Sequence, residues 1–323
     1  MHPPPPSLPF SAQARRGRRA WWRSLALLLT LVAAVLVANL LIIAVLSRSP
    51  LVAERGFDPT NFTPASLGLR EDVFLLLVLL PFAAGLVTLL AGVKLLHRRA
   101  PSSLVYGAQG RVRWGRMAVA AAAWTALLAL GDVVGYLADP ANYTLVLDLE
   151  ALLPILPVVV ALIPLQIAFE ELSLRGYLHQ ELSAATGAPW LGVAASTLLF
   201  GALHFFNPEV RAFGLPAMAT YYLGVGLFLA VLSVLDDGLE LALGVHLATN
   251  LYNVLLVNYA GSTLPTSSLV RTDDVDVGLM LGLFAVQATL FATWALRRGG
   301  RGERGLPRWR AFSYLPPGPP DTE

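Results

Sequence analysis

Eight long apolar stretches dominate this 323-residue sequence and leave few folds open to it. A helix needs about 20 apolar residues to cross roughly 30 Å of hydrocarbon. Stretches of about this length occupy residues 24–46, 73–96, 116–136, 151–169, 188–206, 215–235, 239–259 and 276–296. Because backbone polar groups must be satisfied within the chain in lipid, such stretches predict helices. We therefore predict an all-α integral membrane protein with about eight transmembrane helices.

The composition agrees with a membrane protein and excludes several other classes. Hydrophobic residues make up 56% of the chain and charged residues 14%, whereas a soluble domain carries about 25% charged residues. A net charge of +2 offers no basic excess for nucleic-acid binding. The chain has no cysteine, which removes thiolate catalysis and Cys-ligated zinc. The expected partners are membrane lipids and a membrane-bound peptide, with no nucleic acid.

Basic residues predict the side of the membrane on which each loop lies, because Lys and Arg near span ends stay in the cytoplasm. With both termini cytoplasmic, 17 of the 23 Lys and Arg residues fall on the cytoplasmic side. Arg175 stands apart, inside the membrane or at its edge. The opposite side receives Arg48, Arg55, Arg70, Arg211 and Arg271. We therefore predict cytoplasmic N- and C-termini, in what we interpret as a bacterial plasma membrane.

The two ends of the chain differ in composition from the apolar segments between them. Residues 1–23 and 297–323 are rich in proline and arginine, which predicts disordered cytoplasmic tails. Between the tails we expect three transmembrane helices within 24–146, a helical core within 147–260 and one further transmembrane helix within 261–296.

Three of the apolar segments carry polar side chains that are costly in lipid, at about 2.5–3.5 kcal/mol for a charge near the bilayer centre. In chain order they are Glu170, Glu171 and Arg175 in AFEELSLRGYLHQEL, His204 in STLLFGALHFF, four residues after Phe200, and His246 and Asn250 in LGVHLATNLYN. Glu171 and Arg175 are four residues apart on a helix and can pair. Glu170 then points about 100° away and lacks that partner.

Counting residues from the expected turns places the polar side chains of the three segments at similar depths. At about 1.5 Å per residue, Glu170 and His204 lie level in an antiparallel pair of helices, and His246 and Asn250 can lie beside them. We expect these four residues to line one cavity that opens toward the cytoplasm.

This set of side chains matches peptide hydrolysis by activated water. Glu170 can take a proton from water, one histidine can hold that water, and the other histidine with the Asn amide can stabilise an oxyanion. Glu170, His204 and His246 also form a His₂Glu set, which is a known catalytic zinc sphere. The residues alone leave the metal-free and the zinc-dependent mechanisms open.

The motifs E-E-x-x-x-R, F-x-x-x-H and H-x-x-x-N, each on its own apolar segment, resemble those of the CPBP family. This family comprises CAAX prenyl proteases of the Ras-converting type and bacterial abortive-infection or bacteriocin-processing homologues. The resemblance covers about residues 150–260. It implies an α-helical intramembrane endopeptidase that cleaves a membrane-associated or prenylated protein or peptide, with its active site facing the cytoplasm.

The resemblance also implies a role for each motif residue. Glu170 corresponds to the glutamate that activates water, and His204 to its partner in holding that water. His246 and Asn250 correspond to the pair that stabilises the oxyanion. The positions that support the site are matched by Glu171 and Arg175.

Three further polar residues near the motifs need an interpretation. Asn253 lies seven residues after His246, on the same helix face, and is a candidate supporting residue. We interpret Gln166 as an interhelical hydrogen-bonding group and His179 as a solvated side chain.

Two other classes of function remain open to the sequence. One is a non-enzymatic immunity or peptide-binding membrane protein that uses the same cavity to sequester a peptide. The other is a small transporter, because intramembrane carboxylates and proline-broken helices are typical of transporters. The sequence shows no inverted repeat, which weakens the transporter hypothesis.

Overall fold

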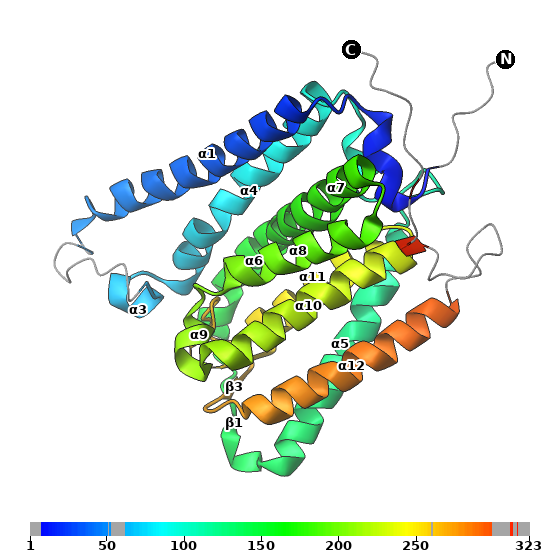
Figure 1. Cartoon of the computed structure of the whole chain (residues 1–323). Coiled ribbons are helices and arrows are strands. Elements are labelled where there is room, and N and C mark those ends of the chain that lie inside the picture. Colours follow the sequence, from blue (N-terminus) through cyan, green and yellow to red (C-terminus); the bar gives the residue numbers. More distant parts are fainter. Residues whose placement is uncertain are drawn as a thin grey trace.

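The computed structural model describes residues 8–50, 52, 62–259, 261–298, 311–312 and 315. The described chain is helical apart from its loops and one small sheet (Figure 1). Parts of the predicted tails and one predicted non-cytoplasmic arginine lie outside the described residues, namely 1–7, 299–310, 313–314, 316–323 and Arg55.

Each of the eight predicted apolar segments is a helix. The helices are α1 (Trp21–Leu46), α4 (Glu71–Leu95), α5 (Trp114–Ala138), α6 (Leu149–Glu171), α8 (Pro189–His204), α10 (Leu215–Leu235), α11 (Glu240–Leu255) and α12 (Val277–Arg298). Among the described residues, six helical runs are long and apolar enough to cross a membrane. The fold is therefore all-α and that of an integral membrane protein, as predicted.

The other two predicted spans, α8 and α11, have 16 residues each. At 1.5 Å per residue such a helix is about 24 Å long, less than the roughly 30 Å of a hydrocarbon core. α11 ends at Leu255 rather than near 259, because residues 257–259 form a strand instead. Both helices carry residues of the polar motifs.

α6 continues without interruption into two further elements. These are η4 (Leu172–Leu178), which is π-helical, and α7 (His179–Thr186). The whole run has 38 residues, about 57 Å at 1.5 Å per residue, which exceeds the thickness of the hydrocarbon core. Gly187 ends it with φ 73°, the left-handed conformation that glycine adopts without strain.

One end of the helix bundle, which we call the sheet end, carries the three strands β1 (Tyr143–Leu145), β2 (Val257–Tyr259) and β3 (Val270–Thr272). β3 is central, antiparallel to β1 and parallel to β2. The short helices at this end are α3 (Pro64–Leu67), η3 (Pro140–Asn142) and α9 (Pro208–Phe213) (Figure 1). Glu71 ties α4 to the same end by accepting hydrogen bonds from the backbone and side chain of Ser267, at 2.7 and 2.8 Å.

The opposite end, which we call the arginine end, carries most of the basic residues predicted to be cytoplasmic. It comprises η1 (Phe10–Arg16), η2 (Pro101–Leu104), the loop 96–113 and the turns 186–189 and 236–239. Arg113 pairs here with Asp236 and Glu240, at 2.9 and 2.6 Å. Arg116 also pairs with Asp236.

The prediction that residues 1–23 are disordered does not hold for the described part of this segment. Phe10–Arg16 form η1, and Phe10 is 1% exposed. The Phe10 N–H donates to Asp237 Oδ1 at 2.6 Å, and the Gln13 side chain donates to the Gly107 carbonyl at 3.1 Å. The segment is ordered because it buries an aromatic ring and satisfies its polar groups against folded elements.

The same docking corrects the interpretation of His179 as solvated. Its ring is buried and stacks on that of Phe10, with 5.7 Å between centroids. Its Nε2 is 2.9 Å from Ser11 Oγ. η1 covers this histidine, and the sequence pattern within α7 alone does not predict that contact.

The described part of the C-terminal tail also contacts the bundle. Ala311 and Phe312 pack against Val193 and its neighbours, so the prediction of a disordered tail over residues 297–323 does not hold for these two residues.

Candidate active site

Glu171, the last residue of α6, is fully buried and lies between the side chains of Arg175 and His246. Its Oε1 accepts hydrogen bonds from Arg175 Nη1 and from His246 Nδ1, each at 2.8 Å. The pair predicted from the spacing of Glu171 and Arg175 is therefore present. The guanidinium of Arg175 also lies over the ring of Phe200, 4.3 Å from its centroid. Glu171 thus fixes the ring orientation of His246.

Glu170 points to different neighbours, although it precedes Glu171 directly. Its Oε1 accepts a hydrogen bond from Gln166 Nε2 at 3.1 Å. Its Oε2 has no hydrogen-bond partner among the described residues and lies 3.7 Å from His246 Nε2. This separation exceeds a direct hydrogen bond. One oxygen of Glu170 is therefore held in place while the other remains available.

His204 is the last residue of α8. Its Nδ1 lies 2.7 Å from the carbonyl oxygen of Phe200, so Nδ1 donates and Nε2 keeps a lone pair in the neutral ring. The ring packs between Phe200 and Tyr222, with centroid distances of 4.2 and 4.8 Å. In the described chain it forms no direct hydrogen bond to Glu170 or His246. Packing, rather than a polar partner on its Nε2, fixes this side chain.

Gln166 is the residue of this site that sequence reasoning did not identify as functional. Its amide donates to Glu170 and its carbonyl oxygen lies 3.5 Å from Asn250 Nδ2. It therefore joins the carboxylate on α6 to the amide on α11. The spacing of four residues between Gln166 and Glu170 places both on one helix face, and this was the available signal.

A cavity of about 650 Å³ brings the four candidate catalytic residues together. Glu170, His204, His246 and Asn250 all line it, and so do Gln166 and Asn253. In the described part of the chain, Asn253 shares this wall with the other candidates but forms no hydrogen bond with them. The buried ion pair of Glu171 and Arg175 lies behind the wall and does not line the cavity.

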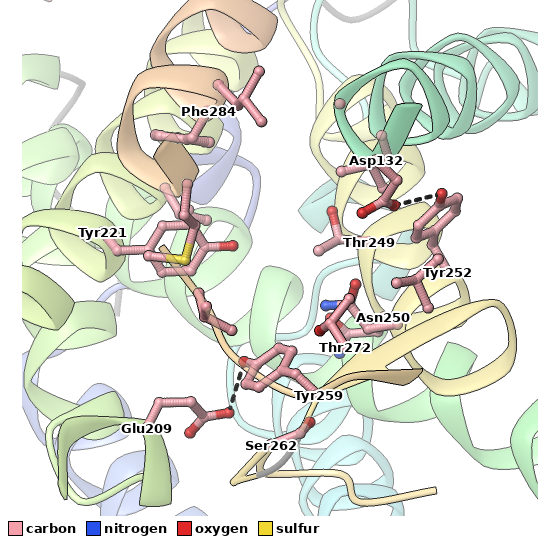
Figure 2. A pocket seen from close by; sticks show the side chains of 18 of the residues that line it. Asp132, Glu209, Tyr221, Thr249, Asn250, Tyr252, Tyr259, Ser262, Thr272 and Phe284 are labelled. Carbon is pink, nitrogen blue, oxygen red and sulfur yellow. Dashed lines mark hydrogen bonds between the residues drawn. The ribbon is translucent and has the colours of Figure 1, made fainter. Parts of the chain in front are cut away.

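The far part of the cavity, beyond Asn250, reaches the sheet end. In Figure 2, Tyr221 and Phe284 form one wall, and Asp132 and Tyr252 face them across the cavity, joined by a hydrogen bond of 2.6 Å. The lining continues at the sheet end through Asn142, Glu209, Tyr259, Ser262, Thr263, Asp274 and Asp276. None of the described lining residues belongs to the arginine end. The cavity thus opens away from the loops predicted to be cytoplasmic.

Two expectations from the sequence therefore conflict with each other. We expected the arginine-rich loops to be cytoplasmic and the cavity to open toward the cytoplasm. In the structure the arginine-rich loops and the opening of the cavity lie at opposite ends. The reason is the direction of α8, which starts near the turn at Gly187 and places His204 at its far end.

The His₂Glu arrangement required for zinc is not formed by Glu170, His204 and His246. Among the described residues, no group of three or more His, Asp or Glu side chains is placed to hold a metal ion. As arranged, the described side chains form no zinc site, and we derive no step through a metal ion.

Comparisons with known proteins were consistent with the motifs. Residues 151–252 match the family model described as Rce1-like, type II CAAX prenyl endopeptidase. The uncharacterized protein YyaK of Bacillus subtilis (strain 168) is 25% identical over 163 residues, which cover 50% of this chain and 54% of YyaK. The chain thus spans about half the length of this relative. No solved structure matches the chain. The predicted resemblance is confirmed: residues 151–252 of this integral membrane protein are similar to the Rce1-like type II CAAX prenyl endopeptidases.

Proposed function

We propose that this protein is an intramembrane endopeptidase that hydrolyses a peptide bond of a membrane-associated or prenylated substrate in a bacterial plasma membrane. One observation carries the proposal. Glu170, which has one oxygen without a hydrogen-bond partner, lines the same cavity as His204, His246 and Asn250. The match of residues 151–252 to the Rce1-like family supports protease activity.

In the proposed mechanism, Glu170 acts as the general base. Its Oε1 is held by Gln166, so Oε2 is the oxygen that takes a proton from water. His204 Nε2 accepts the second O–H of that water and orients it. The water oxygen attacks the carbonyl carbon of the scissile bond, and the carbonyl electrons move to its oxygen.

Asn250 and His246 then stabilise the oxyanion. The Asn250 amide supplies one N–H donor. Glu171 holds His246 through Nδ1 so that Nε2 faces Glu170 and the cavity, and the doubly protonated ring supplies the second donor from Nε2. When the intermediate collapses, the C–N bond breaks and Glu170 returns its proton to the leaving amine. The products are a carboxylic acid and an amine, and one water is consumed.

The test is hydrolysis of a membrane-anchored peptide reporter by wild-type protein and by Glu170→Gln. The substitution keeps the size of the side chain and its contact with Gln166, but it removes the base. We expect the rate to fall by about 10²–10⁴-fold, the usual contribution of a positioned general base. Glu150→Gln is the matched control, because Glu150 is exposed at the start of the same helix and does not line the cavity. A wild-type rate in Glu170→Gln would refute the proposal.

A protein that only binds peptide would give a different pattern. Wild type would then hydrolyse no reporter, while a photocrosslinkable membrane peptide would still label the cavity in wild type, Glu170→Gln and His204→Ala alike. This outcome would replace the protease by the peptide-binding hypothesis.

A further inference from the structure

The active-site cavity is closed at the arginine end by tightly packed structure. Between the site and this end lies an apolar core that includes Leu172, Leu232, Leu239 and Leu241, each 7% exposed or less. None of these four leucine side chains lines the cavity. A peptide arriving from the arginine end would have to displace this core, at a cost of several kcal/mol.

Polar contacts close the arginine end further. Arg113 holds Glu240 at 2.6 Å, and Asp237 accepts hydrogen bonds from the backbone of Phe10 and Ala108, at 2.6 and 2.7 Å. These contacts link η1, the loop 96–113 and the turn between α10 and α11. We call these three linked segments the plug, because they close the arginine end of the bundle.

The sheet end is built in the opposite way. Its loops form the rim of the cavity, and Figure 2 shows Tyr259, Glu209 and Ser262 at that rim. Glu209 fixes the rim by accepting hydrogen bonds from the backbone and side chain of Thr263, at 2.7 and 2.5 Å. The rim is ordered and open, so the sheet end is where a peptide reaches Glu170.

The distribution of basic residues gives the side of the membrane on which this rim lies. Among the described Lys and Arg residues, thirteen lie in or next to the arginine end and four lie at or toward the sheet end. Lys and Arg flanking short loops are retained in the cytoplasm. The sheet end, with the mouth of the cavity, therefore faces away from the cytoplasm.

We propose that the active site is entered from the non-cytoplasmic face, so that its substrate is a peptide segment presented there. The substrate class is then an exported or externally delivered membrane-associated peptide, or the non-cytoplasmic end of a membrane protein. Of the two substrates named in the proposed function, this inference selects the membrane-associated peptide over a prenylated C-terminus made in the cytoplasm. The substrate part of this inference rests on the proposed protease function, whereas the direction of the opening does not.

The chain has no cysteine, which makes accessibility labelling direct. Ser262→Cys places one thiol at the rim of the cavity, and Ser102→Cys places one on the exposed surface of η2 at the arginine end. Each variant is expressed in a bacterial plasma membrane and treated with a membrane-impermeant maleimide, in intact spheroplasts and in inverted vesicles. The cysteine-free wild type is the blank.

We expect Ser262→Cys to be labelled in spheroplasts and Ser102→Cys only in inverted vesicles, each at least tenfold above the other preparation. The reverse pattern would overturn the proposal, and so would labelling of both variants from one side. A wild-type thermal midpoint in detergent shows that both variants are folded.

A second measurement addresses the substrate. A membrane-impermeant peptide reporter is added to sealed vesicles of known orientation, and cleavage is expected only where the sheet end faces the added peptide. If labelling is as expected but Glu170→Gln hydrolyses the reporter normally, the direction of the opening stands and the protease mechanism fails. If Glu170→Gln is inactive but labelling is reversed, the mechanism stands and this inference fails.

Discussion

The two ends of the bundle use polar side chains in opposite ways. At the arginine end, charged groups pair with one another and with backbone groups, as Arg113 does with Asp236 and Glu240. At the sheet end, polar groups line a cavity, and one of them, Glu170 in its depth, keeps an oxygen without a protein partner. Arg99 and Glu171 also carry side-chain atoms without a hydrogen bond, but among the described residues only Glu170 both carries such an atom and lines the cavity. The difference teaches that an incompletely bonded charge marks a candidate site where it also borders a cavity.

The same contrast holds within two consecutive residues. Glu171 is fully buried and bound by Arg175 and His246, whereas Glu170 shares the cavity wall with the candidate catalytic residues. We propose that Glu171 has a structural role, in which it orients His246, and that Glu170 is the general base. The predictions below test this division, from the largest expected effect to the smallest.

Arg175→Met should give the largest loss of stability. It leaves the buried carboxylate of Glu171 without its main countercharge, and breaking a buried pair on one side costs about 3–5 kcal/mol. The double variant Glu171→Leu/Arg175→Met should recover much of this loss, because both charges are gone. The thermal midpoint in detergent measures the effect.

The control for this experiment is Glu170→Gln, which should keep the wild-type thermal midpoint while losing activity. If Arg175→Met is as stable as wild type, Glu171 does not hold the site as we infer. If Glu170→Gln is strongly destabilised, the division between the two glutamates fails.

Gln166→Met should lower kcat by about tenfold and leave KM near its wild-type value. Gln166 holds Oε1 of Glu170 and contacts Asn250, so its loss misorients the base without removing a substrate contact. Gln180→Met is the matched control at the arginine end, where Gln180 is fully buried and bonded to Arg99 and Ser103. That variant should lose stability but keep its kcat, and equal kcat losses in both would contradict our assignment.

The negative charge of the cavity lining should have a smaller effect, which is a preference for positively charged substrates. Carboxylates of the lining include Asp132, Asp139, Glu209, Asp274 and Asp276, and no Lys or Arg is among the described lining residues. Peptide reporters with added lysines should therefore be cleaved a few times faster than reporters with added glutamates at low salt. Because salt screens such fields, kcat/KM for the two reporters should converge as ionic strength rises.

The smallest expected effect is a dependence of the stability of the arginine end on pH, through His97. Burial lowers the pKa of His97 below its ordinary 6.5, and the nearby Arg99 and Arg23 add to the lowering. The neutral ring satisfies both its contacts, donating from Nδ1 to the Arg18 carbonyl and accepting at Nε2 from Tyr177, each at 2.8 Å.

A histidine with a lowered folded-state pKa contributes stability that is fully present above about pH 6.5 and is lost as pH falls from there. Below pH 6.5 the docked η1 segment should loosen, which limited proteolysis near Arg18 measures. His97→Gln should flatten this dependence. An unchanged pH profile in that variant would assign the dependence to another group.

The membrane segments were predictable from the sequence because lipid imposes a length and an apolar composition. α10 has the bounds that the sequence predicted, and α5 differs by two residues at each end. The Glu171 and Arg175 pair was predictable for a similar reason, since helix geometry alone places residues four apart together. These features depend on rules that act within one element.

Features that depend on contacts between distant segments were not predicted. η1 is ordered by Asp237 and Gly107, which follow it by more than 90 residues. The role of Gln166 depends on Asn250, 84 residues later. The direction of the cavity depends on which loops form its rim, and no periodicity within a helix carries that information.

The π-helical turn η4 sets the rotational phase between the two ends of the molecule. A helix that bonds i to i+5 holds one more residue than an α-helix of the same rise, so the segments on either side are offset by about 100°. Removing one residue between Leu172 and Leu178 would turn α7, with His179, by that angle relative to Glu170 and Glu171. His179 would then leave its place beside Phe10, or the glutamates would leave His246. The extra residue of η4 therefore lets His179 face Phe10 while Glu170 and Glu171 face His246.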